Sequence, residues 1–396
     1  MVRELFISLY LLLFRVLFTL CKIFPLKRKI TFVVSFEQNS LYVYEELKKH
    51  PVSFQTVFVC TSSCYRRVAE TVRQEKVFLF EMKNLQHFIR SLYNIATSKF
   101  VIVDNYYGFL AAARFKKGVE CIQLWHAAGA VKTFGLEDKT IRTRGKRALK
   151  RFKKVYAHFD RVVVGSEKMK HIFMRAFGLP PENFLCTGIP RTDLFFDQNR
   201  IRDIKKKLYK QYPAFQKKKV ILYAPTFRDP HPDQFEVPLD WGRLYDELKD
   251  EYIFAVKFHP AVNKGAGLLQ YPDFVVDCPH DMNINELLLV TDYLITDYSS
   301  VPFEFSLLGR PMIFYPYDLE SYQATRGLWE PYDQLVPGPI ACTTAEMIDL
   351  IKTGSFDAGS IEAFSRTWNT YSAGHSSRDL VQYLHEQDEK KGRMYG

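Results

Sequence analysis

The chain has 396 residues, 47% of them hydrophobic and 25% charged, which excludes a disordered protein and leaves room for two domains. Its formal net charge of +11 favours an anionic partner, either nucleic acid, a membrane surface or a phosphorylated substrate. The seven cysteines lack paired metal-ligand spacing, which excludes a zinc site or a disulfide framework and predicts reduced thiols in the cytoplasm.

The N-terminal segment Leu5–Phe24 is apolar and aromatic, and Pro25 follows it. Because Arg15 and Lys22 interrupt the run, it is borderline for a helix that spans a bilayer. No small-residue cleavage site follows, which argues against a signal peptide. We therefore expect residues 1–28 to form a helix that lies in the plane of a membrane, with a helix packed on its own domain as the alternative.

Strands and helices alternate after this segment, which predicts an α/β protein with parallel sheets and crossover helices. The helix expected in the first half is Tyr42–Lys49, and the expected strands are Lys29–Ser35, Thr56–Thr61, Lys99–Val103, Glu120–Leu124 and Arg161–Val164. A basic, polar stretch at residues 202–219 marks a boundary. We expect two doubly wound, Rossmann-like domains facing a cleft, at residues 29–195 and 196–396, with the final helices able to pack back on the first.

His126 follows the expected strand Glu120–Leu124 and precedes a turn of small residues. Such a turn lets a substrate approach the backbone and leaves the imidazole accessible. A histidine placed there can take a proton from an attacking hydroxyl, since its pKa lies near neutrality. A buried histidine with a satisfied hydrogen bond is the alternative reading.

The segment Lys139–Lys154 contains nine basic residues and no acidic residue. Leu149, Phe152 and Tyr156 recur at helical spacing and give this segment an apolar edge. A second attachment to anionic lipid is the favoured interpretation, because stable anchoring generally takes two signals, and a solvated helix face is the alternative. No nucleic-acid-binding signature is present, so we expect no nucleic-acid partner.

The second half contains three strands that end in residues suited to phosphate. The strand from Val220 precedes Thr226 and Arg228, the strand Tyr252–Phe258 brings Lys257 and His259, and the strand Tyr293–Thr296 precedes Ser299 and Ser300. Pro302 suits the first turn of a helix, whose free N–H groups favour an anion. Ligands collect at the carboxyl ends of strands in open α/β sheets, so these three clusters are expected to meet on one diphosphate.

Five motifs together resemble a known family, the CDP-glycerol glycerophosphotransferases of Gram-positive wall teichoic acid synthesis. They occur in the same order along nearly the full chain: WHAAGAVKTFG at 125–135, GIPRTDLFF at 188–196, ILYAPTFRD at 221–229, KFHP at 257–260 and ITDYSSVPFEF at 295–305. The chain is most similar to the glycerol-phosphate primases, since its length leaves no room for the extra N-terminal domain of long polymerases. Its WHAAG stands where those polymerases commonly carry WHGTP, which leaves a primer disaccharide and a growing polymer both open as acceptor.

The resemblance implies a GT-B-like fold and a reaction. A hydroxyl of an undecaprenyl-diphosphate-linked ManNAc-GlcNAc disaccharide would attack the β-phosphate of CDP-glycerol and release CMP. His126 would be the base or position the acceptor, with His259 as a second catalytic candidate. The implied substrate-binding residues are Ala127, Ala128, Gly129 and Ala130 toward the glycerol, Arg191, Lys257, His259, Ser299 and Ser300 on the diphosphate, Pro225 and Thr226 at the nucleotide, Glu304 near ribose or base, and in addition Lys132, Arg228, Phe258 and Asp297.

No group of carboxylates has metal-ligand spacing, and Asp297 is isolated, so we expect no obligatory protein-bound metal, although Mg²⁺ can accompany the diphosphate. The expected location is the cytoplasmic face of the cell membrane, with peripheral attachment. Three alternatives stay open: a glycerol- or ribitol-phosphate polymerase of the same family, a GT-B glycosyltransferase that uses a nucleotide sugar, and a non-catalytic protein of the membrane surface.

Overall fold

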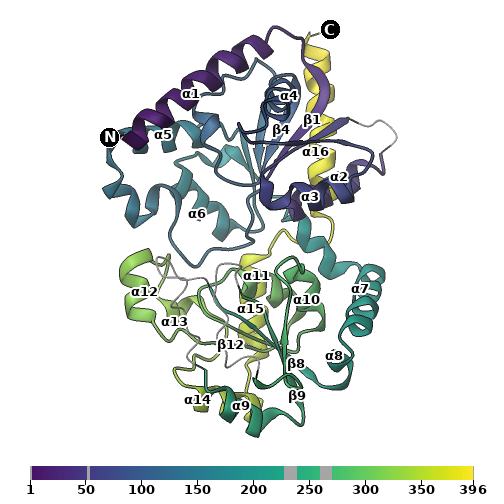
Figure 1. Ribbon diagram of the computed structural model, residues 1–396, viewed down its shortest axis with the longest axis vertical. Helices are drawn as coiled ribbons and strands as arrows, with labels where there is room; N and C mark the ends of the chain where they lie inside the picture. The colour runs from purple at the N-terminus through teal and green to yellow at the C-terminus, as the bar shows by residue number, and fades with distance from the viewer. Residues whose placement is uncertain (1, 51–53, 227–238, 259–269, 396) are drawn as a thin grey trace. The chain divides into compact units, whose positions relative to one another are not determined.

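The structure is a computed structural model that describes residues 2–50, 54–226, 239–258 and 270–395 (Figure 1). The chain forms two compact units. Unit 1 comprises Met1–Ala127, Phe134–Asp193 and Thr370–Gly396, and unit 2 comprises Ala128–Thr133 and Leu194–Asn369. The C-terminal segment therefore belongs to the unit that the N-terminus begins.

Unit 1 is built on a seven-stranded sheet in the order β3-β2-β1-β4-β5-β6-β7, and every pairing in it is parallel. The strands are β1 Lys27–Val34, β2 Gln55–Cys60, β3 Lys76–Leu79, β4 Ser98–Val103, β5 Glu120–Gln123, β6 Arg161–Val163 and β7 Phe184–Leu185. The helices are α1 Val2–Cys21, α2 Glu37–Leu47, α3 Ser62–Thr71, α4 Leu85–Ala96, α5 Gly145–Tyr156, α6 Glu167–Phe177 and α16 Ser376–Tyr395. The predicted strands of this half are confirmed, and β3 and β7 join them.

Unit 2 is built on a second parallel sheet of five strands in the order β10-β9-β8-β11-β12. The strands are β8 Lys219–Ala224, β9 Tyr252–Val256, β10 Val275–Asp277, β11 Tyr293–Thr296 and β12 Met312–Phe314. The helices are α7 Gln198–Gln211, α8 Ala214–Lys217, α9 Trp241–Leu248, α10 Ile284–Val290, α11 Val301–Phe305, α12 Leu319–Arg326, α13 Tyr332–Leu335, α14 Thr344–Thr353 and α15 Ala358–Trp368. The predicted α/β fold with two parallel sheets is confirmed.

Each sheet reverses its strand order once. In unit 1 the chain runs outward through β1, β2 and β3, then returns to place β4 beside β1. In unit 2 it runs outward through β8, β9 and β10 and returns to place β11 beside β8. The carboxyl ends of strands at such a reversal are the usual ligand sites of open α/β sheets. A ligand site is therefore expected at the carboxyl ends of β1 and β4 in unit 1 and of β8 and β11 in unit 2.

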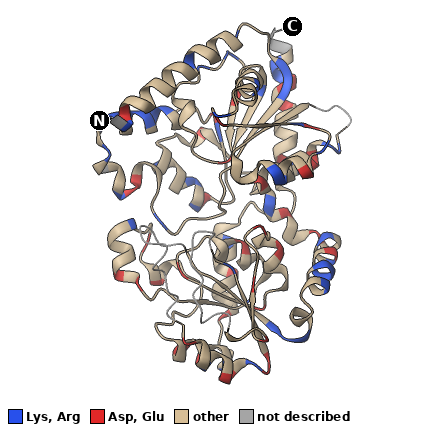
Figure 2. Ribbon diagram, viewed as in Figure 1, with Lys and Arg blue, Asp and Glu red and all other residues tan. Residues whose placement is uncertain are grey.

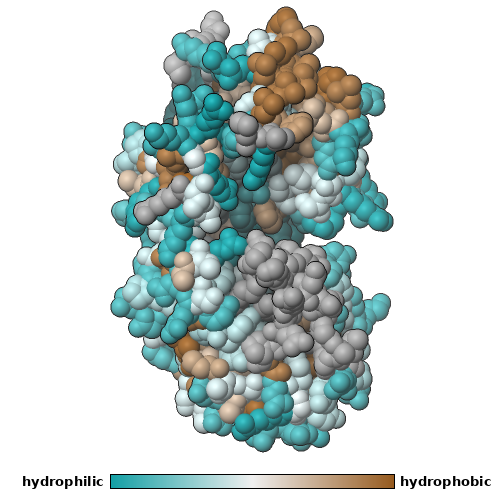
Figure 3. Space-filling view, turned by 60° about the vertical axis from the view of Figure 1, so that its left-hand side comes forward, coloured by the Kyte–Doolittle hydropathy of each residue, from teal (hydrophilic) through white to brown (hydrophobic). Residues whose placement is uncertain are grey.

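Helix α1 has two different faces. Phe14 and Phe18 are buried, and their rings contact Phe109 and Phe115 of unit 1. The opposite face leaves large apolar side chains in contact with solvent, and Figure 3 shows the resulting apolar patch: Leu5, Phe6, Leu9, Leu12, Leu13, Val16 and Leu20. By length and composition, the segment Arg3–Cys21 is long and apolar enough to cross a membrane.

Helix α5 carries the second part of the basic segment Lys139–Lys154, from Gly145 onward, and Figure 2 shows its lysines and arginines. Ala148, Val155 and Tyr156 are buried, whereas Lys146, Lys150 and most of the other cations are exposed. Arg151 donates two hydrogen bonds to the Glu4 carboxylate of α1, at 2.9 and 3.1 Å. The apolar helix and the basic helix are thus tied together within unit 1.

Candidate active site

The backbone at Trp125 holds an unusual conformation directly before His126. Its φ of 57° is the only positive value among the described residues other than glycine. Such a conformation costs roughly 1–3 kcal/mol and persists only where its surroundings enforce it. Gln123 accepts a hydrogen bond from the Trp125 N–H at 2.8 Å, and Asn39 donates one to its carbonyl at 3.0 Å. The indole also packs on three phenylalanines of the same unit, Phe134, Phe173 and Phe177.

The imidazole of His126 stacks on two aromatic rings. Its centroid lies 4.3 Å from that of Phe36 and 4.5 Å from that of Trp125. Nδ1 lies 3.1 Å from the backbone carbonyl oxygen of Asp104. A carbonyl can only accept, so Nδ1 carries the proton and Nε2 of the neutral ring keeps its lone pair. The ring is therefore held in the tautomer that can accept a proton at Nε2.

Burial lowers the pKa of His126 to about 4, with a smaller contribution in the same direction from the Arg191 guanidinium, although the bond to Asp104 opposes the shift. The imidazole is consequently neutral at physiological pH. A neutral, oriented imidazole can act as a general base once a substrate hydroxyl reaches Nε2.

Asp104 is fully buried at the carboxyl end of β4 and joins that strand to the end of β1. Its carboxylate accepts hydrogen bonds from the Ser35 N–H at 2.9 Å, the Phe36 N–H at 2.8 Å and the Tyr107 hydroxyl at 2.7 Å. Burial raises the pKa of Asp104 to about 7, against these bonds, which favour the charged form. The carboxylate fixes the loop that carries Phe36, and the Asp104 carbonyl fixes His126.

Arg191 lies beside His126 in unit 1. Its Nη1 donates to the His126 carbonyl at 2.8 Å, and its N–H donates to the Asn39 side chain at 3.0 Å. Asn39, which is 1% exposed, therefore links the His126 loop to the Arg191 loop through both ends of its amide. The sequence reasoning missed Asn39, Asp104 and Phe36. The signal for Asp104 was present, because this aspartate ends a buried strand as Asp297 does.

The small residues after His126 are packed. Ala127 is partly exposed, whereas Ala128, Gly129 and Ala130 are buried. A Cβ atom on Gly129 would lie 2.4 Å from the Phe303 ring, so any larger residue would displace this ring. Close packing within unit 2 thus accounts for the glycine. Lys132 pairs with Leu328 in an antiparallel bridge, and its Nζ lies 5.9 Å from the ring centroid of Tyr322.

Unit 2 joins its own central strand ends through Asp297. The Asp297 Oδ1 accepts hydrogen bonds from the Thr226 N–H at 2.8 Å and the Tyr298 N–H at 2.6 Å. Tyr332 donates to the Asp297 carbonyl at 2.8 Å. Pro225 and Thr226 remain partly exposed, while Asp297 is 2% exposed. The turn after β8 is therefore fixed against the turn after β11.

Ser299 and Ser300 follow Asp297 and are both partly exposed. The Ser299 hydroxyl accepts a hydrogen bond from the Val301 N–H at 3.2 Å, and Pro302 lies in the first turn of α11 as predicted. Helix α11 has five residues and continues into a 3₁₀ turn at Ser306–Leu308. A helix this short contributes little macrodipole, so any anion here would depend on local N–H and hydroxyl groups. Glu304 is 1% exposed within this helix.

The remaining predicted residues fall in different places. Lys257, after β9, donates from Nζ to the carbonyls of Pro279 at 2.5 Å and His280 at 2.9 Å. Phe258 is 3% exposed and packs in the core of unit 2. Arg228 and His259 lie outside the described residues. Since β9, β8 and β11 are neighbours, the structure brings the turns after all three strands to one edge of the sheet.

Metal ligands are not gathered anywhere in the described part of the chain. No group of three or more His, Cys, Asp or Glu side chains there is placed to hold an ion. The metal-independent reaction expected from the sequence stays a prediction.

The two units with parallel sheets have the GT-B-like architecture, with an oriented neutral histidine in one unit and hydroxyls at the central strand ends of the other. Residues 16–386 match the family described as CDP-glycerol:poly(glycerophosphate) glycerophosphotransferase. The chain belongs to this family, which confirms the predicted resemblance.

Similar proteins fall in the same group. The teichoic acid glycerol-phosphate primase of Bacillus spizizenii is 38% identical over 96% of this chain and 98% of its own. The teichoic acid poly(ribitol-phosphate) polymerase of the same organism is also 38% identical, over 94% of this chain but 58% of its own. The structure of the wall teichoic acid polymerase TagF has the same fold, with a TM-score of 0.78 and 22% identity over 100% of both chains.

Proposed function

We propose that this enzyme is a glycerol-phosphate primase of wall teichoic acid synthesis. It transfers sn-glycerol 3-phosphate from CDP-glycerol to the ManNAc of undecaprenyl-diphosphate-linked ManNAc-GlcNAc and releases CMP. The observation that carries the proposal is the similarity to two glycerol-phosphate primases, of Bacillus spizizenii and Bacillus subtilis, each 38% identical over at least 90% of this chain and of its own.

In the proposed reaction, His126 takes the proton and other polar groups hold the phosphates. The acceptor hydroxyl oxygen attacks the β-phosphorus of CDP-glycerol, the bond from that phosphorus to the oxygen bridging toward CMP breaks, and the hydroxyl proton passes to Nε2 of His126. The tautomer held by the Asp104 carbonyl supports this role for His126. Phosphoryl transfer depends mainly on positioning and charge stabilisation. Ser299, Ser300 and the turn after β8 are the donors proposed for the phosphates, with Arg191 and Lys257 supplying positive charge.

One assay tests the proposed reaction. The full chain is incubated with lipid-linked disaccharide and one of three donors, CDP-glycerol, CDP-ribitol or a nucleotide sugar, and nucleotide release and product mass are followed. We expect CMP release with CDP-glycerol and one added glycerol phosphate per acceptor. Many added units per acceptor would show that the chain is a polymerase. Transfer from CDP-ribitol alone would show that the donor carries ribitol. Transfer of a sugar from a nucleotide sugar would overturn the proposal. Activity that persists in EDTA would support a reaction without an obligatory metal.

We also propose that α1 and α5 attach unit 1 to the cytoplasmic face of the cell membrane. The support is the exposed apolar face of α1 beside the exposed cations of α5. Stable anchoring takes two signals of this kind. Replacing Leu5, Leu9 and Leu12 by serine should weaken binding to anionic vesicles while the buried Phe14 and Phe18 keep α1 folded on unit 1. A variant that binds vesicles as well as the parent would contradict this attachment.

A further inference from the structure

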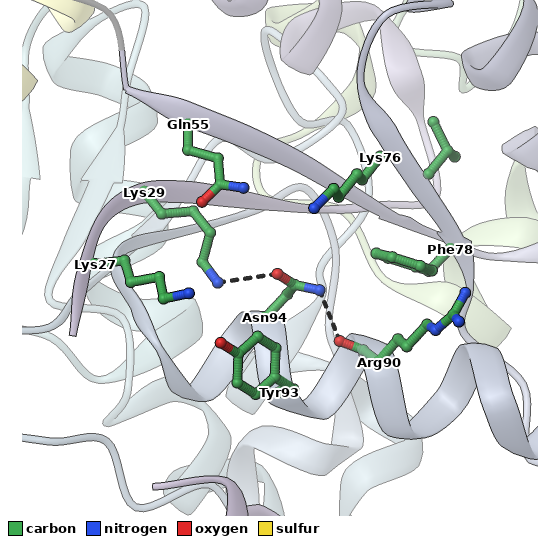
Figure 4. Close-up of a pocket in the computed structure, with 9 residues that line it drawn as sticks. Lys27, Lys29, Gln55, Lys76, Phe78, Arg90, Tyr93 and Asn94 are labelled. Carbon is green, nitrogen blue, oxygen red and sulfur yellow. Dashed lines mark hydrogen bonds between the residues drawn. The ribbon is translucent and has the colours of Figure 1, made fainter. Parts of the chain in front are cut away.

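Unit 1 contains a cavity of about 460 Å³ at the amino ends of β1, β2 and β3 (Figure 4). Its lining includes Lys27 and Lys29 of β1, Lys76 of β3, and Arg90, Tyr93 and Asn94 of α4. In Figure 4 the side chains of Lys27 and Lys29 point toward α4, and Lys76 reaches toward the same space from β3. The cavity lies at the end of β1 opposite to Asp104 and His126. The eight residues of β1 separate these two ends by about 25 Å.

The cavity is lined by four cations and no carboxylate. Within the described ranges, none of these four side chains forms an ion pair, although other cations at the same sheet edge do. Arg28 and Lys99 both pair with Asp388 of α16, at 2.6 and 2.5 Å. Side chains alternate between the faces of a strand, so Arg28 reaches α16 while Lys27 and Lys29 reach α4. One face of this edge is therefore neutralised within the protein, and the other has an excess of positive charge.

Lys29 is the most constrained of the four cations, with an exposed fraction of 1%. Its Nζ donates to Asn94 at 2.9 Å and to Thr97 at 2.6 Å, and an ammonium group has three donors. The Nζ atoms of Lys29 and Lys27 lie 5.2 and 5.6 Å from the centroid of the same Tyr93 ring. Burial, and then the nearby Lys27 and Lys76, lower the pKa of Lys29 to about 7. A bound anion would favour the charged form of Lys29, and it would thereby counteract both the burial and the repulsion from Lys27 and Lys76.

The position of Tyr93 indicates which kind of anionic molecule would fit this cavity. Its ring contacts Phe24 edge to face, with centroids 5.3 Å apart. Phe24 is 51% exposed and Ile23 is 78% exposed, and together they extend the apolar face of α1 to the cavity. An apolar surface that ends at a cavity lined by cations matches a phospholipid, whose acyl chains and phosphate are adjacent. We propose that this cavity binds the phosphate of an anionic phospholipid headgroup. The inference rests on the proposed membrane attachment through α1 but not on the proposed reaction.

The test compares vesicles of phosphatidylcholine that contain phosphatidylglycerol with vesicles of equal surface charge that contain a fatty acid in its place. We expect the full chain to prefer the phospholipid vesicles. The double substitution Lys27→Gln/Lys76→Gln changes exposed side chains and should remove this preference, with a loss of roughly fivefold in partition for each lysine. The substitution Lys29→Met should do the same if the variant folds. The matched control is Lys206→Gln/Lys207→Gln on α7, which removes two exposed cations from unit 2.

Each outcome decides the proposal. Loss of the preference in the double variant but not in the control supports a headgroup site, whatever the folding of Lys29→Met. Equal binding of both kinds of vesicle by the parent chain, or an unchanged preference in the double variant, overturns it. Inorganic phosphate or soluble glycerophosphate that raises the melting temperature of the parent chain but not of the double variant, without any vesicle preference, would assign the cavity to a soluble phosphate instead. None of these readouts involves CMP release, so failure of the proposed reaction would be seen separately.

Discussion

The two central strand pairs, β1/β4 in unit 1 and β8/β11 in unit 2, share one hydrogen-bonding arrangement but have different side chains around it. In each, an aspartate that ends one strand accepts backbone N–H groups from the turn after its neighbour: Asp104 from Ser35 and Phe36, and Asp297 from Thr226. Unit 1 adds an aromatic stack and a neutral imidazole. Unit 2 adds partly exposed serines. The same arrangement at the strand ends thus orients an imidazole in one unit and lies beside two serine hydroxyls in the other.

This difference separates two requirements of phosphoryl transfer. The proposed removal of the proton needs one nitrogen with a free lone pair, and the Asp104 carbonyl holds His126 in a tautomer that has one at Nε2. Charge stabilisation needs several donors directed at one region, and the β8/β11 pair brings backbone and hydroxyl groups together there. Substitutions at the β1/β4 strand ends should therefore affect turnover, and substitutions at the β8/β11 strand ends should affect donor binding.

The largest effect is expected for His126→Ala. Without the base, turnover should fall by about 10² to 10⁴, while the affinity for CDP-glycerol stays close to that of the parent. Steady-state kinetics and calorimetric titration with CDP-glycerol measure the two quantities. His171→Ala, at an exposed position on α6, is the control and should leave both unchanged. A His126→Ala variant that keeps more than half of the normal turnover would remove His126 from the reaction.

The complementary change in unit 2 is the double substitution Ser299→Ala/Ser300→Ala. A hydrogen bond to a charged group contributes about 1.5–3 kcal/mol, so the loss of even one should weaken the binding of CDP-glycerol roughly 10- to 150-fold. CMP, which has a single phosphate, should lose less affinity. Equal losses for CDP-glycerol and cytidine would show that these serines do not contact the phosphates, and the contrast between the units would fail.

A smaller effect is expected for Asp104→Asn. Both carboxylate oxygens accept hydrogen bonds, so an amide would place an N–H group opposite a backbone or hydroxyl donor. The resulting mismatch should lower the free energy of unfolding by about 1–3 kcal/mol. Denaturant unfolding measures this loss, and CDP-glycerol affinity should stay constant because Asp297 holds the turns of unit 2 separately. A variant as stable as the parent would show that Asp104 does not join β1 to β4.

The smallest effect is a difference in titration. The pKa of His126 is lowered from 6.5 to about 4, so the folded state binds this proton later than the unfolded state as the pH falls. His126 should therefore contribute a loss of stability as the pH falls from 6.5 through 4. The pKa of Asp104 is raised from 3.8 to about 7, so this group should contribute a loss of stability as the pH rises from 3.8 to about 7. Imidazole nitrogen shifts in NMR spectra, which also report the tautomer, test the histidine directly, and a midpoint near 6.5 would contradict the assignment.

Local signals in the sequence were enough to predict the parallel sheets and the strand ends that carry His126, Thr226 and Ser299. A buried apolar run that stops at a polar residue indicates such an end without knowledge of the partner strand. This signal also marks the position of Asp104 at a strand end. The hydrogen bonds that Asp104 and Asn39 form could not be predicted from it, because they join segments distant in sequence. Gly129 shows the same limit: the sequence suggested room for a substrate, and the structure places the Phe303 ring against it.

The two faces of α1 also determine how the enzyme would meet a lipid-linked acceptor. To stand upright across a bilayer, the helix would have to withdraw Phe14 and Phe18 from unit 1 and leave Arg151 without Glu4. With the proposed attachment, a helix that keeps these contacts would lie flat and hold unit 1 at a constant height and tilt. The search for the proposed lipid-linked acceptor would then be diffusion in a plane, in which His126 keeps the same distance from the membrane surface.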